Sequence, residues 1–150
     1  MLKEFVEKKH YRFVDKIDNW EDAIRESCKS LEADGTVEPS YAELIINTVK
    51  EYGPYIVIMP NVAMPHSTEK AEGVHKTAIA FMKVEQPVSF EEGNKEKDAQ
   101  LFFTLAAEDG EQHLANMQKL VVLLSNEDLV KDLADAHTPE DLLALHEKYL

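Results

Sequence analysis

An apolar run leads into a histidine in the segment Tyr55-Ile56-Val57-Ile58-Met59-Pro60-Asn61-Val62-Ala63-Met64-Pro65-His66-Ser67-Thr68. The short, continuously apolar run at residues 56–59 is typical of a strand buried on both faces. Proline fixes its own φ and favours an extended conformation in the residue before it, so Pro60 and Pro65 predict a stiff, non-helical loop after this strand. His66 is expected at the tip of that loop.

Apolar residues at helical spacing lie on both sides of this segment. The expected helices are a short one at residues 2–6, one at residues 19–33 that ends at Asp34-Gly35, one that begins at Pro39-Ser40 and ends at Gly53-Pro54, and three after Asp109-Gly110, the last opened by Pro139. Ser40 and Glu43 predict a capping box in the second long helix. In the first C-terminal helix, one face is expected to carry Leu114, Met117, Leu120, Val121 and Leu124.

Further strands are predicted at residues 77–83 and 99–106, with a short extended piece at residues 11–14. Residues 86–88 are expected to form a turn or edge segment, and residues 91–97 an exposed loop. Strands mixed with helices predict an α/β fold in which helices cover a layered, mixed β-sheet. At 150 residues the chain is expected to form a single domain, residues 1–150.

Composition excludes several classes of protein. The 29 acidic and 16 basic residues give a formal net charge of −13, which argues against a nucleic-acid partner and fits solubility or a basic protein partner. Cys28 is the only cysteine, so an internal disulfide is excluded, and we expect it to be a packing residue. The N-terminus is not a signal peptide, and no apolar window is long enough to span a bilayer. We therefore expect a cytoplasmic protein without direct membrane insertion.

Two histidines follow predicted strands, at the sheet edge where open α/β folds bind ligands. His66 lies on the loop described above, and His113 lies in the first turn of the helix after Gly110. A helix N-terminus favours anions, so a neutral His113 could donate a hydrogen bond to a phosphoryl oxygen. No role is expected for His10, His75, His137 and His146, which are interpreted as surface residues.

Two histidines that converge at this edge suggest either a metal site or phosphoryl chemistry. The spacing of a zinc motif is missing, as are the phosphate-binding loops of nucleotide enzymes and the Gly-x-Ser-x-Gly elbow of hydrolases. A phosphorylatable histidine is the simplest chemical use, with no metal and no cofactor. A metal-binding or small-molecule-binding module with His66 and His113 as ligands stays as an alternative.

At this point a family resemblance can be stated. The residues Ile58 to Ser67 resemble the active-site segment of the enzyme IIA components of the bacterial sugar phosphotransferase system (EIIA type-2, mannitol/fructose superfamily), in which an apolar-Ala-apolar-Pro-His-small pattern carries the phosphorylated histidine. Residues 109–120 resemble the family's second histidine segment. The similarity covers about residues 15–147, and residues 53–60 are most similar to the ascorbate-type branch.

The resemblance implies a phosphoryl relay for carbohydrate uptake. The phosphocarrier HPr would phosphorylate His66, which would pass the group to a cysteine of a cognate enzyme IIB and so indirectly serve the membrane enzyme IIC. His113 would donate a hydrogen bond to the phosphoryl oxygens, and Ser67 and Thr68 would add hydroxyl or backbone donors. A regulatory relative, in which phosphorylation only controls binding to another protein, is the alternative. The lack of an added DNA-binding domain favours transport.

The sequence departs from the family pattern at three positions. Asn61 stands where many members have Gly, and Asn also tolerates the left-handed conformation that Gly supplies. Ser67 stands where many members have Gly or Ala. Mannitol-type members carry an upstream arginine, whereas the nearest basic residue here is Lys50, which cannot form a planar fork.

Overall fold

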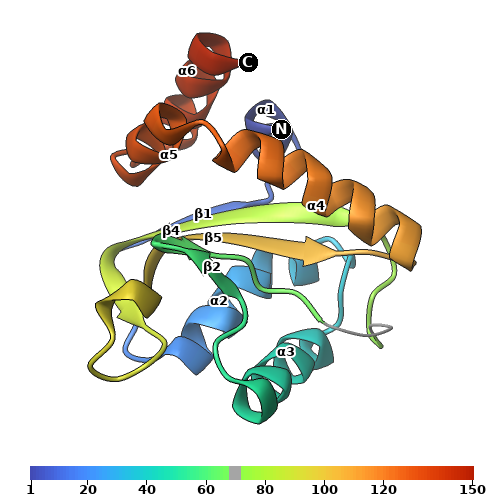
Figure 1. The fold of residues 1–150 in the computed structure, drawn as a ribbon. Helices are drawn as coiled ribbons and strands as arrows, with labels where there is room; N and C mark the ends of the chain where they lie inside the picture. Colours follow the sequence, from blue (N-terminus) through green and yellow to red (C-terminus); the bar gives the residue numbers. More distant parts are fainter. Residues whose placement is uncertain (68–71) are drawn as a thin grey trace.

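The computed structural model describes residues 1–67 and 72–150 (Figure 1). The helices are α1 (Leu2–Glu7), α2 (Trp20–Ala33), α3 (Pro39–Tyr52), the 3₁₀ turn η1 (Lys95–Lys97), α4 (Gly110–Leu124), α5 (Glu127–Ala134) and α6 (Pro139–Tyr149). The strands are β1 (Tyr11–Val14), β2 (Val57–Met59), β3 (Asn61–Ala63), β4 (Ala78–Ser89) and β5 (Asp98–Ala106). Within the described ranges, no helix combines the length and apolar character needed to cross a membrane.

The strands form one mixed sheet in the order β1-β4-β5-β3-β2. β5 lies in the centre, antiparallel to β4 and parallel to β3, while β1 runs parallel to β4 and β2 antiparallel to β3. This arrangement confirms the predicted α/β class with a mixed sheet. It also places the carboxyl ends of β3 and β5 side by side, because parallel neighbours end at the same edge.

Helices cover both faces of the sheet and make three layers: α2 and α3 lie below it, and α1, α4, α5 and α6 above it (Figure 1). Side chains alternate between the faces along each strand. In β5, Phe102 packs into the cluster shared with α2 and α3, and Phe103 packs into the cluster shared with the other helices. Two separate apolar cores therefore hold the central strand from opposite sides.

The strand expected before Pro60 is present as β2, but a second short strand, β3, takes the place of the first part of the loop expected after it. β2 and β3 pair antiparallel, and the chain reverses where Asn61 adopts a φ of 70°. Asparagine tolerates this left-handed conformation, which permits the abrupt reversal. The prediction that residues 56–59 are buried on both faces is wrong, since β2 is an edge strand and leaves Ile58 41% exposed.

The predicted capping box of α3 is also wrong. The helix begins at Pro39, its N-cap is Glu38, and no side chain caps it. Proline fits the first helical position because it has no N–H to leave unpaired. Ser40 therefore lies inside the first turn, beyond the position from which it could cap the helix.

β4 extends past the predicted end of its strand. Residues 86–88, expected as a turn or edge segment, belong to β4, whose pairing with β5 changes register between Lys83 and Val88. Pro87 has no N–H to donate, and such a residue is tolerated in a strand at an irregularity of this kind.

The buried face of α4 only partly matches the prediction. Leu120 and Leu124 are buried together with Asn116 and Leu123. Leu114 and Val121 are 57% and 58% exposed, so the expectation that they share the face of Leu120 is wrong. These two residues are seven positions apart and form a second apolar stripe that faces solvent.

His10 is not the surface residue that the sequence suggested. It is 4% exposed, and its Nε2 lies 2.5 Å from a carboxylate oxygen of Asp34 at the end of α2. His75 and His137 are exposed, and His146 accepts a hydrogen bond from the backbone N–H of Lys3. Cys28 is fully buried, as expected for a packing residue.

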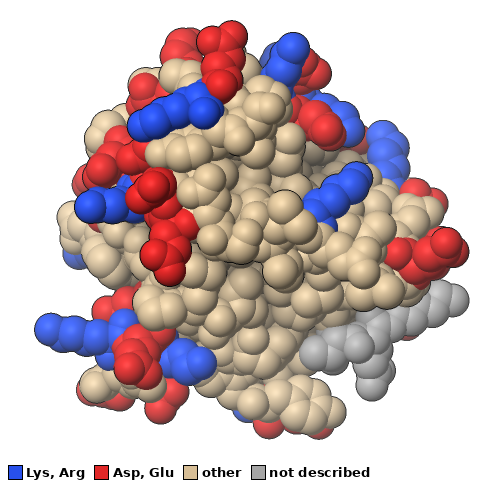
Figure 2. Space-filling model, turned by 45° about the horizontal axis from the view of Figure 1, so that its top comes forward, with Lys and Arg blue, Asp and Glu red and all other residues tan. Residues whose placement is uncertain are grey.

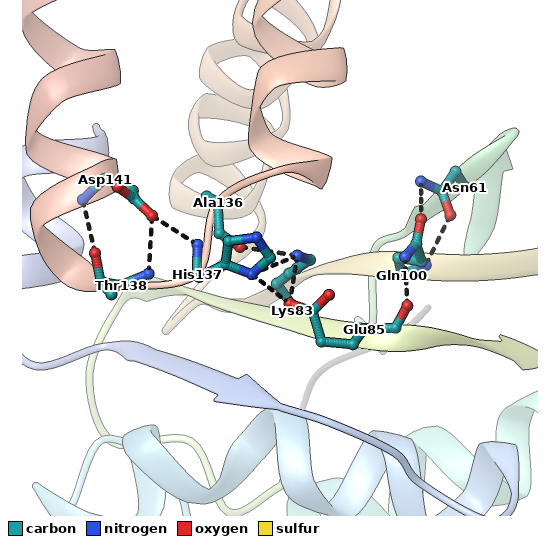
Figure 3. Close-up of polar contacts among 8 residues, drawn as sticks. All are labelled: Asn61, Lys83, Glu85, Gln100, Ala136, His137, Thr138 and Asp141. Carbon is teal, nitrogen blue, oxygen red and sulfur yellow. Dashed lines mark hydrogen bonds and ion pairs between the residues drawn. The ribbon is translucent and has the colours of Figure 1, made fainter.

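A buried lysine joins the sheet to the C-terminal helices (Figure 3). Lys83 of β4 is 1% exposed, and its Nζ donates to the carbonyl of Ala136 at 2.8 Å and to Glu85 Oε1 at 2.6 Å. The same Glu85 oxygen accepts from Nδ1 of His137 at 2.7 Å. The next residues begin α6, where Asp141 accepts from the backbone N–H groups of His137 and Thr138. The sheet thus fixes the start of α6.

Lys83→Met is expected to destabilise the fold by about 1–3 kcal/mol, because the carbonyl of Ala136 loses a charged donor inside the protein. Urea unfolding followed by circular dichroism measures this change. Lys148→Met is a matched control, since Lys148 pairs with Asp132 at the surface with 62% of its side chain exposed. Equal effects of the two variants would contradict a structural role of the buried Lys83 contacts.

Candidate active site

The two histidines singled out in the sequence lie together at the carboxyl edge of β3 and β5. His66 follows β3 after Met64-Pro65, and the carbonyl of Pro65 accepts from the N–H of Leu105 at 2.9 Å. His113 is reached through the turn after β5 that opens α4. The ring centroids of His66 and His113 are 5.6 Å apart, with 30° between the ring planes. Parallel pairing of the two strands causes this convergence.

The ring of His66 is oriented by its own loop. The imidazole is almost buried, with 8% of the residue exposed, and Nδ1 lies 2.6 Å from the backbone carbonyl oxygen of Met64. A carbonyl can only accept, so Nδ1 carries the proton in this contact. In the neutral ring, Nε2 then keeps its lone pair. This tautomer makes Nε2 the nucleophilic nitrogen.

Burial favours the neutral form of both histidines. The pKa of His66 is lowered below 6.5, chiefly by desolvation and also by the nearby His113, while the hydrogen bond to Met64 acts in the opposite direction. The pKa of His113 is lowered as well, by desolvation. Both rings are therefore predominantly neutral at pH 7.

The pH dependence of His66 follows from this shift. The protonation midpoint of its ring is expected below 6.5, so its nucleophilic form persists as the pH falls through 6.5 and is lost only at lower pH. Titration of the ring signals by NMR measures the midpoint. A midpoint at or above 6.5 would contradict the burial argument.

The start of α4 does not offer a free anion site. Asp109 is the N-cap, and its side chain accepts from the N–H of Gln112 at 2.8 Å. The N–H of His113 donates to the carbonyl of Asp109 at 3.0 Å. The chain's own carboxylate thus occupies the helix terminus, and any contact of His113 with an anion would come from its ring.

The other two predicted donors are placed differently. Ser67 is partly exposed, and its backbone and side chain make hydrogen bonds with Tyr41. Thr68 lies outside the residues that the structure describes. Across the described part of the chain, no group of three or more His, Cys, Asp or Glu side chains is arranged to hold a metal ion.

Sequence reasoning missed two tyrosines at this site. The Tyr55 hydroxyl donates to the backbone carbonyl of His66, and the Tyr41 hydroxyl donates to the carbonyl of Leu105 at 2.5 Å. Burial raises the pKa of both phenols, to about 12 for Tyr55. For Tyr41 the available signal was a tyrosine on the apolar face of a helix, because a buried hydroxyl needs a partner. Tyr55 lies between α3 and β2, where helical spacing gives no such signal.

Comparison with known proteins gives the family. Residues 4–149 match the family model described as "Phosphoenolpyruvate-dependent sugar phosphotransferase system, EIIA 2". The ascorbate-specific PTS system EIIA component of Shigella boydii is 33% identical over 141 residues, which are 93% of this chain and 90% of that protein.

Solved structures agree with this match. The mannitol-specific cryptic enzyme IIA CmtB of Escherichia coli has a TM-score of 0.84 at 28% identity, over 96% of each chain. The enzyme IIA in the Escherichia coli complex of IIAMTL with phosphorylated IIBMTL has a TM-score of 0.78 at 26% identity, over 91% of this chain and 93% of that one.

Proposed function

Since this chain belongs to the EIIA 2 family of the phosphoenolpyruvate-dependent sugar phosphotransferase system and is a phosphoryl carrier of that system, we propose that His66 is the residue that carries the phosphoryl group. The observation that supports this assignment most is the 2.6 Å contact of Nδ1 with the carbonyl of Met64, which leaves the lone pair on Nε2. The neighbouring ring of His113 marks one wall of the site.

Phosphoryl acceptance then needs no base. The lone pair of His66 Nε2 attacks the phosphorus of a phosphohistidine donor, the new N–P bond forms, and the electron pair of the broken P–N bond returns to the donor imidazole. His66 releases no proton, because its single ring proton is on Nδ1. The ring gains positive charge as the bond forms, and the Met64 carbonyl stabilises that charge through the Nδ1–H.

Around the phosphoryl group, His113 would donate a ring N–H to a phosphoryl oxygen. Thr68 would add a donor, and so would Ser67 by exchanging its hydrogen bonds with Tyr41 for ones to the phosphoryl group. A neutral His113 can serve as such a donor without repelling the cationic phosphohistidine ring. Positioning and charge stabilisation account for most of the catalysis in phosphoryl transfer.

The donor would be phospho-HPr and the acceptor a cysteine of a cognate enzyme IIB, which in turn serves a membrane enzyme IIC. The complex of IIAMTL with phosphorylated IIBMTL supports an IIB acceptor. On the side that carries α4, Figure 2 shows a broad, mostly uncharged area with a basic side chain within it and the other charged side chains toward its margin. The exposed Leu114 next to His113 suits transient docking on such a surface.

Similarity to the ascorbate-specific relative supports an ascorbate-type carbohydrate.

Reconstitution tests this function. The protein is incubated with phosphoenolpyruvate, enzyme I and HPr, and its intact mass is followed before and after an ascorbate-type or a mannitol-type IIB is added. We expect a gain of one phosphoryl group that requires HPr and is lost to the ascorbate-type IIB faster than to the mannitol-type IIB. A protein that gains no phosphoryl group beside phosphorylated controls would contradict the carrier function.

A further inference from the structure

The phenol of Tyr55 contacts His66 twice. Its hydroxyl donates to the backbone carbonyl of His66. Its ring meets the imidazole nearly at a right angle, with centroids 5.2 Å apart and 83° between the planes. Tyr55 stands between the end of α3 and the start of β2, so the contact ties the histidine loop to a segment eleven residues earlier in the chain.

We propose that Tyr55 is a positioning residue that keeps His66 in the Nδ1–H tautomer with Nε2 directed to the incoming phosphoryl group. This inference rests on the proposed role of His66. Tyr55 itself touches no reacting atom, and it acts through the peptide group and the ring of His66.

The orientation of the imidazole depends on a contact inside its own loop. Nδ1 donates to a carbonyl only two residues earlier, so rotation of the intervening peptides would break this bond. The Tyr55 hydroxyl donates to the carbonyl of His66, at the far end of these peptides, and so limits their rotation. The edge-to-face ring contact limits rotation of the imidazole about its side-chain bonds. Two restraints from one residue thus act on backbone and ring together.

The hydroxyl keeps this role over the working range of pH. Burial raises the pKa of Tyr55 to about 12, so the phenol stays protonated and can donate at neutral pH. The second tyrosine acts on the backbone of the loop. The Tyr41 hydroxyl donates to the carbonyl of Leu105, whose N–H donates to the carbonyl of Pro65. Tyr41 also hydrogen-bonds with Ser67, so it braces the backbone on both sides of His66 without contacting the imidazole.

Tyr55→Phe tests the hydroxyl, and Tyr55→Leu removes both the hydroxyl and the ring contact. Tyr55 is only half-buried, so water can replace the lost donor and the Phe variant is expected to fold. Tyr149→Phe is a matched control, because the Tyr149 hydroxyl donates to Asp132 at 2.5 Å in the C-terminal helices. Two quantities are measured: the ¹⁵N shifts of the His66 ring nitrogens, and kcat and KM for phosphoryl transfer from phospho-HPr.

The wild type and Tyr149→Phe are expected to show a protonated Nδ1 and an unprotonated Nε2. Tyr55→Phe should show a mixture of tautomers and a kcat about tenfold lower, with KM for phospho-HPr unchanged. Tyr55→Leu should lower kcat further. A wild-type tautomer and kcat in both Tyr55 variants, or equal changes in Tyr149→Phe, would overturn the proposal. The NMR measurement needs no phosphoryl donor, so it tests the role of Tyr55 independently of the proposed function. A wild-type protein that is not phosphorylated on His66 would refute the proposed function instead.

Discussion

His66→Ala is expected to take up no phosphoryl group from phospho-HPr, with the rate of acceptance falling on the order of a thousandfold or more, to background. The substitution removes the nitrogen of this chain that would form the new bond to phosphorus, and neighbouring groups cannot replace a missing nucleophile. Intact mass after incubation with phosphoenolpyruvate, enzyme I and HPr measures the uptake.

His66→Gln serves as a second variant, since an amide keeps a polar side chain in this nearly buried position. It should also remain unlabelled while its thermal unfolding resembles that of the wild type. Robust labelling of either variant would mean that another residue carries the phosphoryl group.

His113→Ala is expected to become labelled but to pass its phosphoryl group to enzyme IIB about 10- to 100-fold more slowly. The ring of His113 lies beside that of His66, where an N–H can stabilise charge on the phosphoryl oxygens during transfer. Acceptance still reaches completion because enzyme I keeps regenerating phospho-HPr. In onward transfer each phosphoprotein has a single phosphoryl group to pass on. The loss of the hydrogen-bond donor of His113 therefore lowers the measured rate.

Single-turnover transfer from the isolated phosphoprotein to IIB measures this rate. His75→Ala is the matched control, because His75 is an exposed histidine that follows His66 closely in the sequence. An onward rate in His113→Ala equal to that of His75→Ala would exclude His113 as a donor to the phosphoryl group.

Sequence periodicity was sufficient to predict the fold class and the convergence of two histidines. The apolar run of β5 and the two prolines around residues 60–65 are local signals, and parallel pairing of β3 and β5 converts them into proximity. Asn61 also behaved as its residue type predicts, with a φ of 70°.

The burial or exposure of other residues depends on tertiary contacts that cannot be predicted from the spacing of neighbouring residues in the sequence. The burial of His10 depends on Asp34, which is 24 residues away, and the exposure of Val121 depends on how α4 lies on the sheet. The contacts of Tyr55 with His66 likewise arise only when the hairpin of β2 and β3 folds the chain back. Helical spacing shows that a residue lies on a face, but not which neighbour covers that face.

The central claim is tested most directly by locating the phosphoryl group on the imidazole. Protein with ¹⁵N-labelled histidine is phosphorylated through enzyme I and HPr, and the ring nitrogens are assigned in long-range ¹H–¹⁵N spectra. The contact of Nδ1 with the Met64 carbonyl predicts a phosphoryl group on Nε2 of His66 and a proton retained on Nδ1. A phosphoryl group on Nδ1 of His66, or on any other histidine, would contradict the account.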